Sequence, residues 1–533
     1  MKLFLSITAL SFLGLLMLLC YSCETTESAG GVAIDTAKPP VVEQEQIETK
    51  LPEKTLPEAK QPEAKQPEVK RSEIKQPEAK SAPPDEPLNI VAKIGEYVLT
   101  KEELQTRLMT ELRPQYGEYG KQEEPVDAKT VLTKMIAEKA MIIEARNLNY
   151  LEDETIQTPL NRFKRRKLAT LLLENHLRGK ITVTNSEIAD QIKSDPNLSR
   201  ERAKTIVERT KANHLLLEYY NQICENLHLQ KLSSNFPEAA RIHQRLLLHP
   251  KEPRRLKLIR ISQVQNELTP EEKNIVLATF DTGKVTLKDW FDTLCELSPT
   301  SRPRDLHTVA GVERLLDRAT RIPLFVSEAE SLGLDKDENL LKQIKEREDM
   351  HLFGKATREK VKDIPEPNEQ EIMAYFEKNK EAFGTQNTLR IDQIWCQDYK
   401  TAQKVKDELG SGKGFEAVRK EYSLQKKAYA FNAYPHSEGI FFKNLWDGEP
   451  NEIVGPVKGF YSNGVKWRIV KILEKTPGKP KEYSSDMKQR IQMRMQEEQR
   501  NTILENYRKE LLEKYSYEIY AERIRDIDPL NIP

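Results

Sequence analysis

Cysteine is scarce in this chain, with only five among 533 residues. Cys20 and Cys23 stand near the N-terminus, and the other three, Cys224, Cys295 and Cys396, are far apart in the sequence. Small exported domains that depend on disulfides carry several cysteines at close spacing. The sequence therefore indicates a fold that is stabilised by its hydrophobic core and not by a disulfide framework.

An excess of either charge is absent as well, because 84 lysines and arginines balance 84 aspartates and glutamates. A protein that binds nucleic acid through its overall field needs excess positive charge to release counterions from the phosphates. The eight histidines form no HExxH motif and no paired spacing typical of metal ligands. We therefore expect no nucleic-acid partner, no metal and no other cofactor.

Hydrophobic residues are also few, at 38%, whereas charged residues reach 32%. This balance favours long, well-solvated helices over a sheet-rich enzyme. The length of the chain allows several domains.

A long apolar run, Leu3–Leu19, follows Lys2 at the N-terminus. A cationic start, an apolar stretch and a small residue before a cysteine are typical of a secretory signal. The next residues are similar to a bacterial lipobox, with a serine at the small position before Cys23. We predict a lipoprotein signal peptide at residues 1–22 and lipidation of Cys23, with Cys20 as the alternative cysteine. An uncleaved signal anchor is a second interpretation, because a run of this length can span a bilayer.

Proline, glutamate and lysine dominate the segment that follows, in which Leu51–Lys80 is a degenerate five-residue repeat. Prolines at this density prevent helix formation, and the alternating charges keep the chain solvated. We predict that residues 23–88 are a disordered tether, with a fully extended reach on the order of 200 Å.

The part beyond the tether contains an internal duplication. Ile94–Leu104 is echoed by Phe280–Trp290, each a short strand-like piece followed by a threonine N-cap and a helix. Further matches follow in the same order at one spacing: Glu144-Ala145, Leu148, Tyr150 and Asp153-Glu154 against Glu328-Ala329, Leu332, Leu334 and Asp337-Glu338. We predict a first helical unit with a helical extension at residues 89–270 and a second unit at residues 271–384.

A different pattern follows the second unit. It consists of a strand-like run, Leu389–Cys396, a helix-like run, Thr401–Ser423, and a second strand-like run, Lys466–Leu473. The glycine-rich Gly410–Gly414 lies at the end of a helical pattern, so we interpret it as a helix C-cap and not as a phosphate loop. A long helix with a thin apolar stripe is predicted over Ser484–Tyr515.

These motifs resemble the parvulin-type (PpiC) peptidyl-prolyl isomerase domain, and with the duplicated helical entry they are similar to the SurA/PpiC family of exported folding factors. The resemblance places a parvulin-like domain at residues 385–475 and a C-terminal helix and tail at residues 476–533. It implies a mainly α fold with a small α+β parvulin-like domain, duplicated SurA-like helical units and a long C-terminal helix. In that family, the helices around the module form one peptide-holding body.

The resemblance also implies two histidines on the strands of the module, but this chain carries Gln393 and Arg468 at those positions. No catalytic residue is therefore assigned. The segment that bears the family's pocket Met and Phe is expected to be missing. The candidate peptide-binding residues that replace it are aromatic: Phe441, Phe442, Trp446 and Trp467.

Three functions follow from these observations. The first is a cell-envelope foldase or chaperone of the SurA/PpiC type, lipid-anchored on the periplasmic side of a bacterial envelope, which binds unfolded exported polypeptides without ATP. The second is an active peptidyl-prolyl isomerase with a rebuilt pocket. The third is a structural lipoprotein that uses the module to dock a partner. The expected contacts are unfolded client polypeptides and the membrane through the N-terminal lipid.

Overall fold

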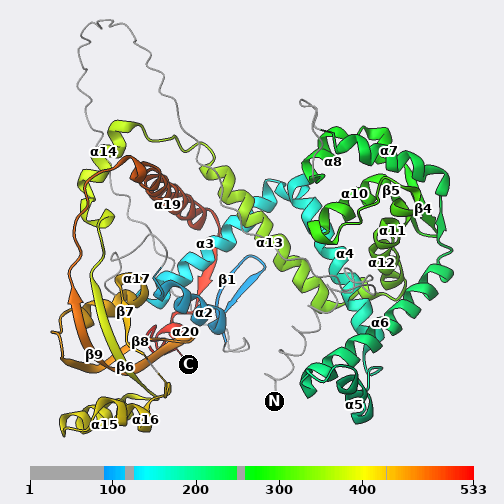
Figure 1. Ribbon diagram of the computed structural model, residues 1–533. Coiled ribbons are helices and arrows are strands. Elements are labelled where there is room, and N and C mark those ends of the chain that lie inside the picture. The colour runs from blue at the N-terminus through cyan, green and yellow to red at the C-terminus, as the bar shows by residue number, and fades with distance from the viewer. Residues whose placement is uncertain (1–88, 115–124, 249–257, 428, 533) are drawn as a thin grey trace, which may run out of the picture. The chain divides into compact units, whose positions relative to one another are not determined.

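The computed structural model describes residues 89–114, 125–248, 258–427 and 429–532. The predicted signal peptide, the lipidated Cys23 and the tether at 23–88 lie outside the described residues. The described chain forms two compact units (Figure 1). Unit 1 is Asn161–Gln343, and unit 2 combines the chain up to Leu160 with the chain from Ile344 onward.

Each unit contains the same hairpin and helix. In unit 2 these elements are β1 (Ile90–Ile94), β2 (Tyr97–Thr100) and α2 (Lys101–Leu112). In unit 1 they are β4 (Val276–Phe280), β5 (Gly283–Thr286) and α10 (Leu287–Glu296).

Both hairpins have a register shift at the same place, after the Ile90–Thr100 pair in one and the Val276–Thr286 pair in the other. Both helices begin at a threonine whose hydroxyl accepts from the third helical N–H, and the acidic residue there accepts from the threonine N–H. Such a capping box satisfies two backbone donors at the helix start. The duplication predicted from the sequence is confirmed.

A long helix and a short strand complete each unit. In unit 1, α6 (Arg200–Asn226) leads to β3 (Gln230–Lys231), which pairs with β4. In unit 2, α19 (Lys488–Lys514) leads to β10 (Tyr517–Ile519), which pairs with β1. Both helices have 27 residues. Each unit therefore has a three-stranded sheet whose central strand is the first strand of the hairpin.

The two copies exchange their long helices. The hairpin of unit 2 comes from the first copy, but its long helix α19 comes from the end of the chain. The hairpin of unit 1 comes from the second copy, and its long helix α6 comes from the first. The compact units are thus distributed along the chain differently from the segments 89–270 and 271–384, whose boundaries as sequence repeats stay a prediction.

Two helices of 24 residues carry the chain between the units. The division falls inside α4 (Glu154–Leu177) and inside α13 (Glu338–Val361), which occupy corresponding places in the two copies.

The copies differ in their central helix. It is continuous in the first copy, as α3 (Ala128–Asn147), but is divided in the second into α11 (Val309–Ala319) and α12 (Arg321–Ser331). Pro323 explains the break, because proline has no N–H to donate to the carbonyl four residues earlier.

The remaining elements of the helical body are η1 (Tyr150–Glu152), α5 (Asn185–Ser194), η2 (Ser233–Asn235), α7 (Phe236–Leu246), α8 (Ile261–Glu267), α9 (Pro270–Lys273), η3 (Pro299–Ser301), η4 (Leu334–Lys336), α14 (Glu369–Lys378), η5 (Lys380–Phe383), η7 (Ser485–Met487) and α20 (Ala521–Ile524).

The core of unit 2 contains side chains from both of the chain segments that make up the unit. Val91 of the hairpin and Ile136 of α3 are buried with Leu352 of α13 and Leu504 of α19. The helices α19 and α3 pack against each other (Figure 1). In unit 1, Trp290 and Phe291 are fully buried in the corresponding core. None of the helices in the described ranges combines the length and the apolar character needed to cross a membrane.

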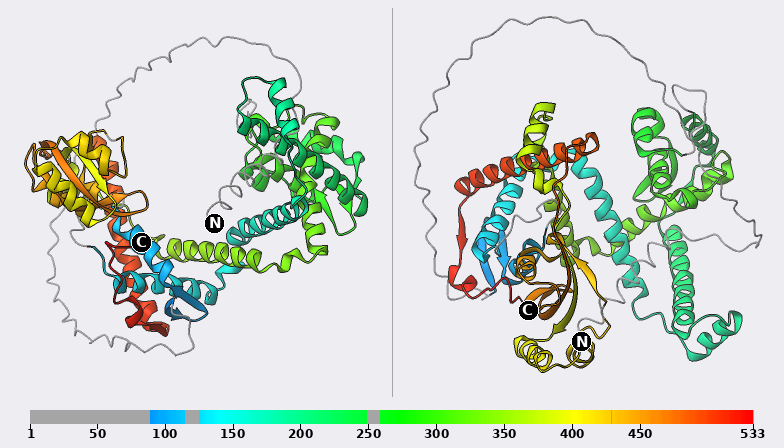
Figure 2. Two further views of the ribbon diagram at one scale, coloured as in Figure 1. Left: turned by 90° about the horizontal axis from the view of Figure 1, so that it is seen from below. Right: turned by 60° about the vertical axis from the view of Figure 1, so that its left-hand side comes forward.

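The predicted α+β module lies between α14 and α19 (yellow to orange in Figure 2). Its elements are β6 (Thr388–Cys396), α15 (Tyr399–Gly410), α16 (Phe415–Tyr422), β7 (Phe431–Ala433), α17 (Pro435–Glu438), η6 (Gly439–Phe441), α18 (Phe442–Trp446), β8 (Ile453–Tyr461) and β9 (Gly464–Thr476). The four strands are antiparallel in the order β7-β6-β9-β8. In the first copy, only the short segment Asp195–Ser199 stands between α5 and α6, so the module belongs to unit 2 alone.

The fold class predicted from the sequence, mainly α with a small α+β domain, is confirmed. Within the module, the two predicted strands are present as β6 and β9. The helix-like run Thr401–Ser423 is two helices, because the glycine-rich turn ends α15 and Gly412 has a φ of +94°. A left-handed residue of this kind at a helix end favours glycine.

Hydrogen bonds between side chains of the two copies stabilise unit 2. Tyr97 Oη donates to Asp349 Oδ1 at 2.8 Å, and Arg146 Nη2 donates to the same oxygen at 2.8 Å. Asp349 is buried and belongs to α13, whereas Tyr97 and Arg146 belong to the first copy. Burial and the neighbouring carboxylate raise the pKa of Tyr97, so the phenol stays the donor at physiological pH.

We expect Tyr97→Phe to lower the free energy of unfolding of unit 2 by about 1–2 kcal/mol, because the buried carboxylate loses one of its donors. Urea denaturation of the full chain, followed by hydrogen exchange of the β1 and β2 amides, measures this loss. Tyr429→Phe is the matched control, since Tyr429 is 84% exposed. Unchanged exchange of the hairpin amides in Tyr97→Phe would contradict the prediction.

Candidate functional site

The sheet of the module separates two sets of side chains, because neighbouring residues of a strand point to opposite faces. Trp395 of β6 lies opposite Arg468 of β9, and Gln393 lies opposite Val470. These residues share one face. The other face carries Ile394, Cys396 and Ile469, which pack with partly buried Trp467 against α15 and α16.

Gln393 and Arg468, the two positions where the family resemblance implied histidines, contact each other. Arg468 Nη1 donates to Gln393 Oε1 at 2.9 Å, and Arg468 Nη2 donates to Glu438 Oε2 at 2.5 Å. The guanidinium also lies 4.9 Å from the centre of the Trp395 ring. Arg468 is 1% exposed and Glu438 is 6% exposed. The site is a buried ion pair with an amide as third member.

The neighbouring strand makes room for the guanidinium at Gly459. A Cβ at residue 459 would lie 2.5 Å from Arg468 Cζ, so a larger residue there would force the guanidinium to shift. The observed position of the Arg468 guanidinium therefore depends on a glycine in β8.

This arrangement limits the chemistry of the site. An arginine offers only donors and is always charged in proteins, so it cannot exchange a proton as an imidazole can. Its two terminal nitrogens already bond to Gln393 and Glu438. The position of the expected histidines is thus occupied by groups that stabilise each other inside the module.

Glu438 is the site residue that sequence reasoning missed. Its carboxylate comes from α17, just before the segment where the family's pocket helix was expected to be missing. That segment contains the end of η6 and the short helix α18, and the absence of the family's pocket helix stays a prediction. The available signal was physical: a buried arginine on a strand requires an acidic partner, and Glu438 is one of the acidic residues in the connection between β7 and β8.

The four aromatic candidates do not form one pocket. Phe441 packs edge-to-face on Phe460 at 5.0 Å, whereas Phe442 stacks with Trp446 at 5.7 Å within the core above β6 and β9. Trp467 lies on the opposite face of the sheet from Arg468 and contacts Tyr399 at 4.8 Å. Contact of these aromatics with a peptide stays a prediction.

The helical body of unit 2 contacts the module beside this site. The Pro114 ring packs on Gly439, where a Cβ would lie 2.8 Å from Pro114 Cγ. Arg113 donates to the Ser462 carbonyl and lies over the Phe460 ring, 5.5 Å from its centre. A proline of the chain itself thus occupies the surface next to Phe441.

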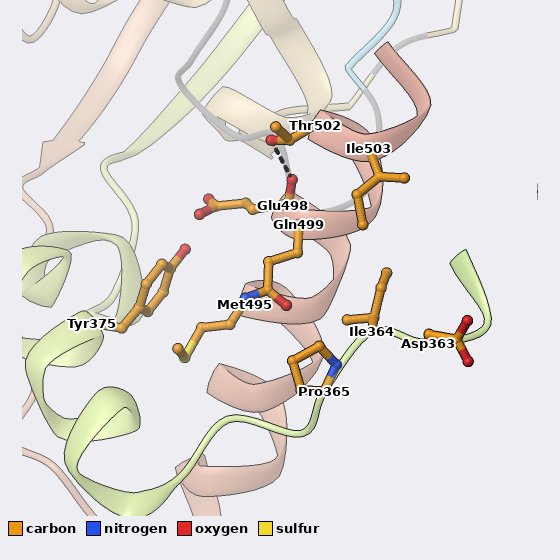
Figure 3. Close-up of a pocket in the computed structure, with 9 residues that line it drawn as sticks. All are labelled: Asp363, Ile364, Pro365, Tyr375, Met495, Glu498, Gln499, Thr502 and Ile503. Atoms are coloured by element: carbon orange, nitrogen blue, oxygen red, sulfur yellow. Dashed lines mark hydrogen bonds between the residues drawn. The ribbon is translucent and has the colours of Figure 1, made fainter. Parts of the chain in front are cut away.

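A second candidate site lies in the helical body of unit 2 (Figure 3). It is a cavity of about 530 Å³. Its lining comes from α14, α19 and the segment before α14: Asp363, Ile364, Pro365, Tyr375, Met495, Glu498, Gln499, Thr502 and Ile503. Burial raises the pKa of Tyr375 to about 12, so its phenol is neutral at physiological pH. The sequence signalled this site only through Met495 and Ile503 in the apolar stripe of the long helix.

Comparison with known proteins identifies the module. Residues 367–488 match the family model of the PPIC-type PPIASE domain, so this part of the chain is a PpiC-type domain. The chain is 28% identical over 163 residues to YacD of Bacillus subtilis (strain 168), whose name marks it as a provisional peptidyl-prolyl cis-trans isomerase. That match covers 28% of this chain and 52% of YacD, about half of its length.

Several solved structures are also similar to parts of this chain. One comes from work on PEB4 and Cj1289 of Campylobacter jejuni, which are described there as two SurA-like chaperones. It is 15% identical to this chain, with a TM-score of 0.23, and the match covers 45% of this chain and 98% of that one. PrsA from Bacillus subtilis is 20% identical, with a TM-score of 0.16, over 45% of this chain and 93% of its own.

We expect Arg468→Met to lower the free energy of unfolding by about 3–5 kcal/mol, because Glu438 is left buried without its cation. The double variant Arg468→Met/Glu438→Gln should recover most of this loss, since no buried charge remains. Thermal and urea unfolding of the full chain measure both effects.

The control for this prediction is Lys193→Met. It breaks the ion pair between Lys193 and Asp190, whose side chains are 78% and 64% exposed. Exposed ion pairs of this kind contribute little to the free energy of unfolding. A single variant Arg468→Met as stable as the parent chain would show that the buried pair is not a structural requirement.

Proposed function

We propose that this chain, which carries a PpiC-type peptidyl-prolyl isomerase domain, is a foldase-type chaperone that binds unfolded exported polypeptides without ATP and does not turn over prolyl bonds. The observation that carries the proposal is the buried trio of Arg468, Glu438 and Gln393. A rotamase grips the proline and stabilises the twisted amide over the planar one. Here the groups at the centre of the site are bonded to each other instead.

Binding of extended chains needs apolar surface with adaptable polar rims, and no reacting group. The cavity between α14 and α19 offers such a surface outside the module. We further propose that the protein acts at the periplasmic side of a bacterial cell envelope, anchored by a lipid on Cys23. This location rests on the signal and lipobox patterns at the N-terminus.

An active isomerase with a rebuilt pocket is the second candidate. The observation in its favour is the packing of Pro114 on Gly439, beside the Phe441–Phe460 pair. A surface that accepts a proline ring of the chain itself has a shape that suits the proline of a peptide.

We expect the full chain to suppress aggregation of a urea-unfolded outer-membrane protein at equimolar concentration without ATP. The same protein should leave the isomerisation rate of a short prolyl peptide unchanged, because the site lacks its histidines. Light scattering and a protease-coupled peptide assay measure the two activities.

Failure to suppress aggregation would refute the chaperone proposal. Acceleration of isomerisation that Phe441→Ala abolishes would favour the rebuilt pocket. A single stoichiometric partner on affinity capture, with neither activity present, would favour a structural lipoprotein that docks a partner through the module.

A further inference from the structure

The cavity of unit 2 has a counterpart position in unit 1, because the duplication includes the elements that line it. α5 and α14 both have ten residues and begin with a capping box, at Thr184 and Asn368. Ile188 and Ile372 take the same buried place in the two helices. The long helices α6 and α19 match over their whole length and in the register of the strands that follow them.

The two units also share the contact that joins these helices at their start. Arg200 at the first position of α6 donates to Asn185 Oδ1 at 2.6 Å. Lys488 at the first position of α19 forms an ion pair with Glu369, the first residue of α14. The pair α5–α6 and the pair α14–α19 are therefore held together in the same way at the N-terminus of the long helix. The two pairs differ further along that helix.

One difference is at the twelfth position of the long helix, which is Lys211 in α6 and Gln499 in α19. Lys211 Nζ donates to the Thr182 carbonyl at 2.7 Å and forms an ion pair with Glu187 Oε1 at 2.6 Å. It thereby bridges the long helix, the preceding segment and α5. The hydrogen bond from Lys211 lowers the pKa of Glu187 to about 2, so the pair stays charged well below neutral pH.

Gln499 makes no such bridge and lines the cavity of unit 2 (Figure 3). The residues that correspond to Thr182 and Glu187 are Glu366 and Glu371. Glu371 Oε2 accepts from the Asn368 N–H at 2.8 Å as part of its capping box. An acceptor carboxylate is thus present in unit 2 as well, and what is missing is the cation on the long helix.

We propose that the groove between α14 and α19 is the site at which this protein holds a client chain, and that Gln499 keeps it open whereas Lys211 closes its counterpart in unit 1. This inference rests on the proposed chaperone function and assigns it one groove per chain. The occupant is an extended polypeptide segment with a large apolar side chain next to a lysine or arginine.

The chemistry of the lining selects this occupant. Ile364, Pro365, Tyr375, Met495 and Ile503 supply apolar surface, and methionine adapts to side chains of different shape. A volume of about 530 Å³ falls within the range of sites that enclose a small ligand or a few side chains.

The charged residues of the lining are acidic. They are Asp363 and Glu498, and no lysine or arginine belongs to the lining. Glu498 already forms an ion pair with Arg494, one turn away, at 3.8 Å, so the charge that the rim presents to a client comes mainly from the exposed carboxylate of Asp363. A cation beside the apolar side chain of the client is therefore complementary to the rim, and a carboxylate is repelled.

The test exchanges the two residues in the full chain. Gln499 is exposed, so Gln499→Lys leaves the core intact and supplies the bridging ammonium. We expect this variant to bind a fluorescein-labelled, end-capped peptide with Lys-Phe-Lys at its centre at least tenfold more weakly in fluorescence anisotropy. Gln499→Met should retain binding, because it adds no cation.

The reciprocal variant Lys211→Gln should leave the stoichiometry at one peptide per chain, because Gly179 and Thr210 stand in unit 1 at the positions of Asp363 and Glu498. A peptide with Glu-Phe-Glu at its centre should bind the parent chain at least tenfold more weakly than the Lys-Phe-Lys peptide. Peptide crosslinking to a photoreactive residue at position 503 should disappear in Gln499→Lys.

Equal peptide affinity in the parent chain and Gln499→Lys, with crosslinking at 503 unchanged or absent in both, would overturn the groove assignment. Aggregation suppression is measured on the same samples to separate this result from the proposed function. Suppression that survives in Gln499→Lys places the client elsewhere on the chain. Absence of suppression in the parent chain would instead refute the chaperone function itself.

Discussion

Backbone pairing between β1 and β10 is the constraint on which unit 2 depends. β1 comes from the start of the described chain and β10 from its end, and Ala92 is paired with Ile519 across this distance in sequence. An unpaired strand edge exposes donors and acceptors that need partners. The long helix before β10 is held at the same time, because Leu504 and Leu511 complete the core around the hairpin. The module between α14 and α19 is therefore inserted into a body whose two ends are joined.

The same pairing explains why the two copies cannot be separate domains in sequence order. β3 of the first copy pairs with β4 of the second, and β10 at the end of the chain pairs with β1 of the first. Each core contains side chains from both copies, as Leu352 and Ile136 illustrate in unit 2. Long-range closure of this kind costs loop entropy before any contact forms. Buried apolar surface and ladder hydrogen bonds offset that cost.

Within the duplicated body, divergence has been unequal. The residues that maintain the fold are equivalent in the two copies, as the threonine caps and the buried isoleucines of α5 and α14 show. The copies differ in the connection before the long helix and in a surface residue of that helix. One copy has an inserted PpiC domain and a groove lined by Gln499, whereas the other has a short connection and the bridge made by Lys211. The Arg468–Glu438 pair continues this pattern, because it preserves the shape of the module while it removes the expected histidines. A buried pair of this kind is costly to break and adds little net stability.

The sequence by itself determined the elements whose signals are local. Threonine caps and strand patterns predicted both hairpins, the glycine-rich turn marked the end of α15, and the order of strands and helices identified the module with Gln393 and Arg468 at its centre. These features depend on residues within a few positions of each other. The tertiary structure decided the rest, namely Glu438 as the partner of Arg468, the exchange of α6 and α19, the opposite placement of Trp467 and the groove at Gln499. Each of these is a contact between residues distant in sequence, and composition and periodicity carry no information about which distant residues meet.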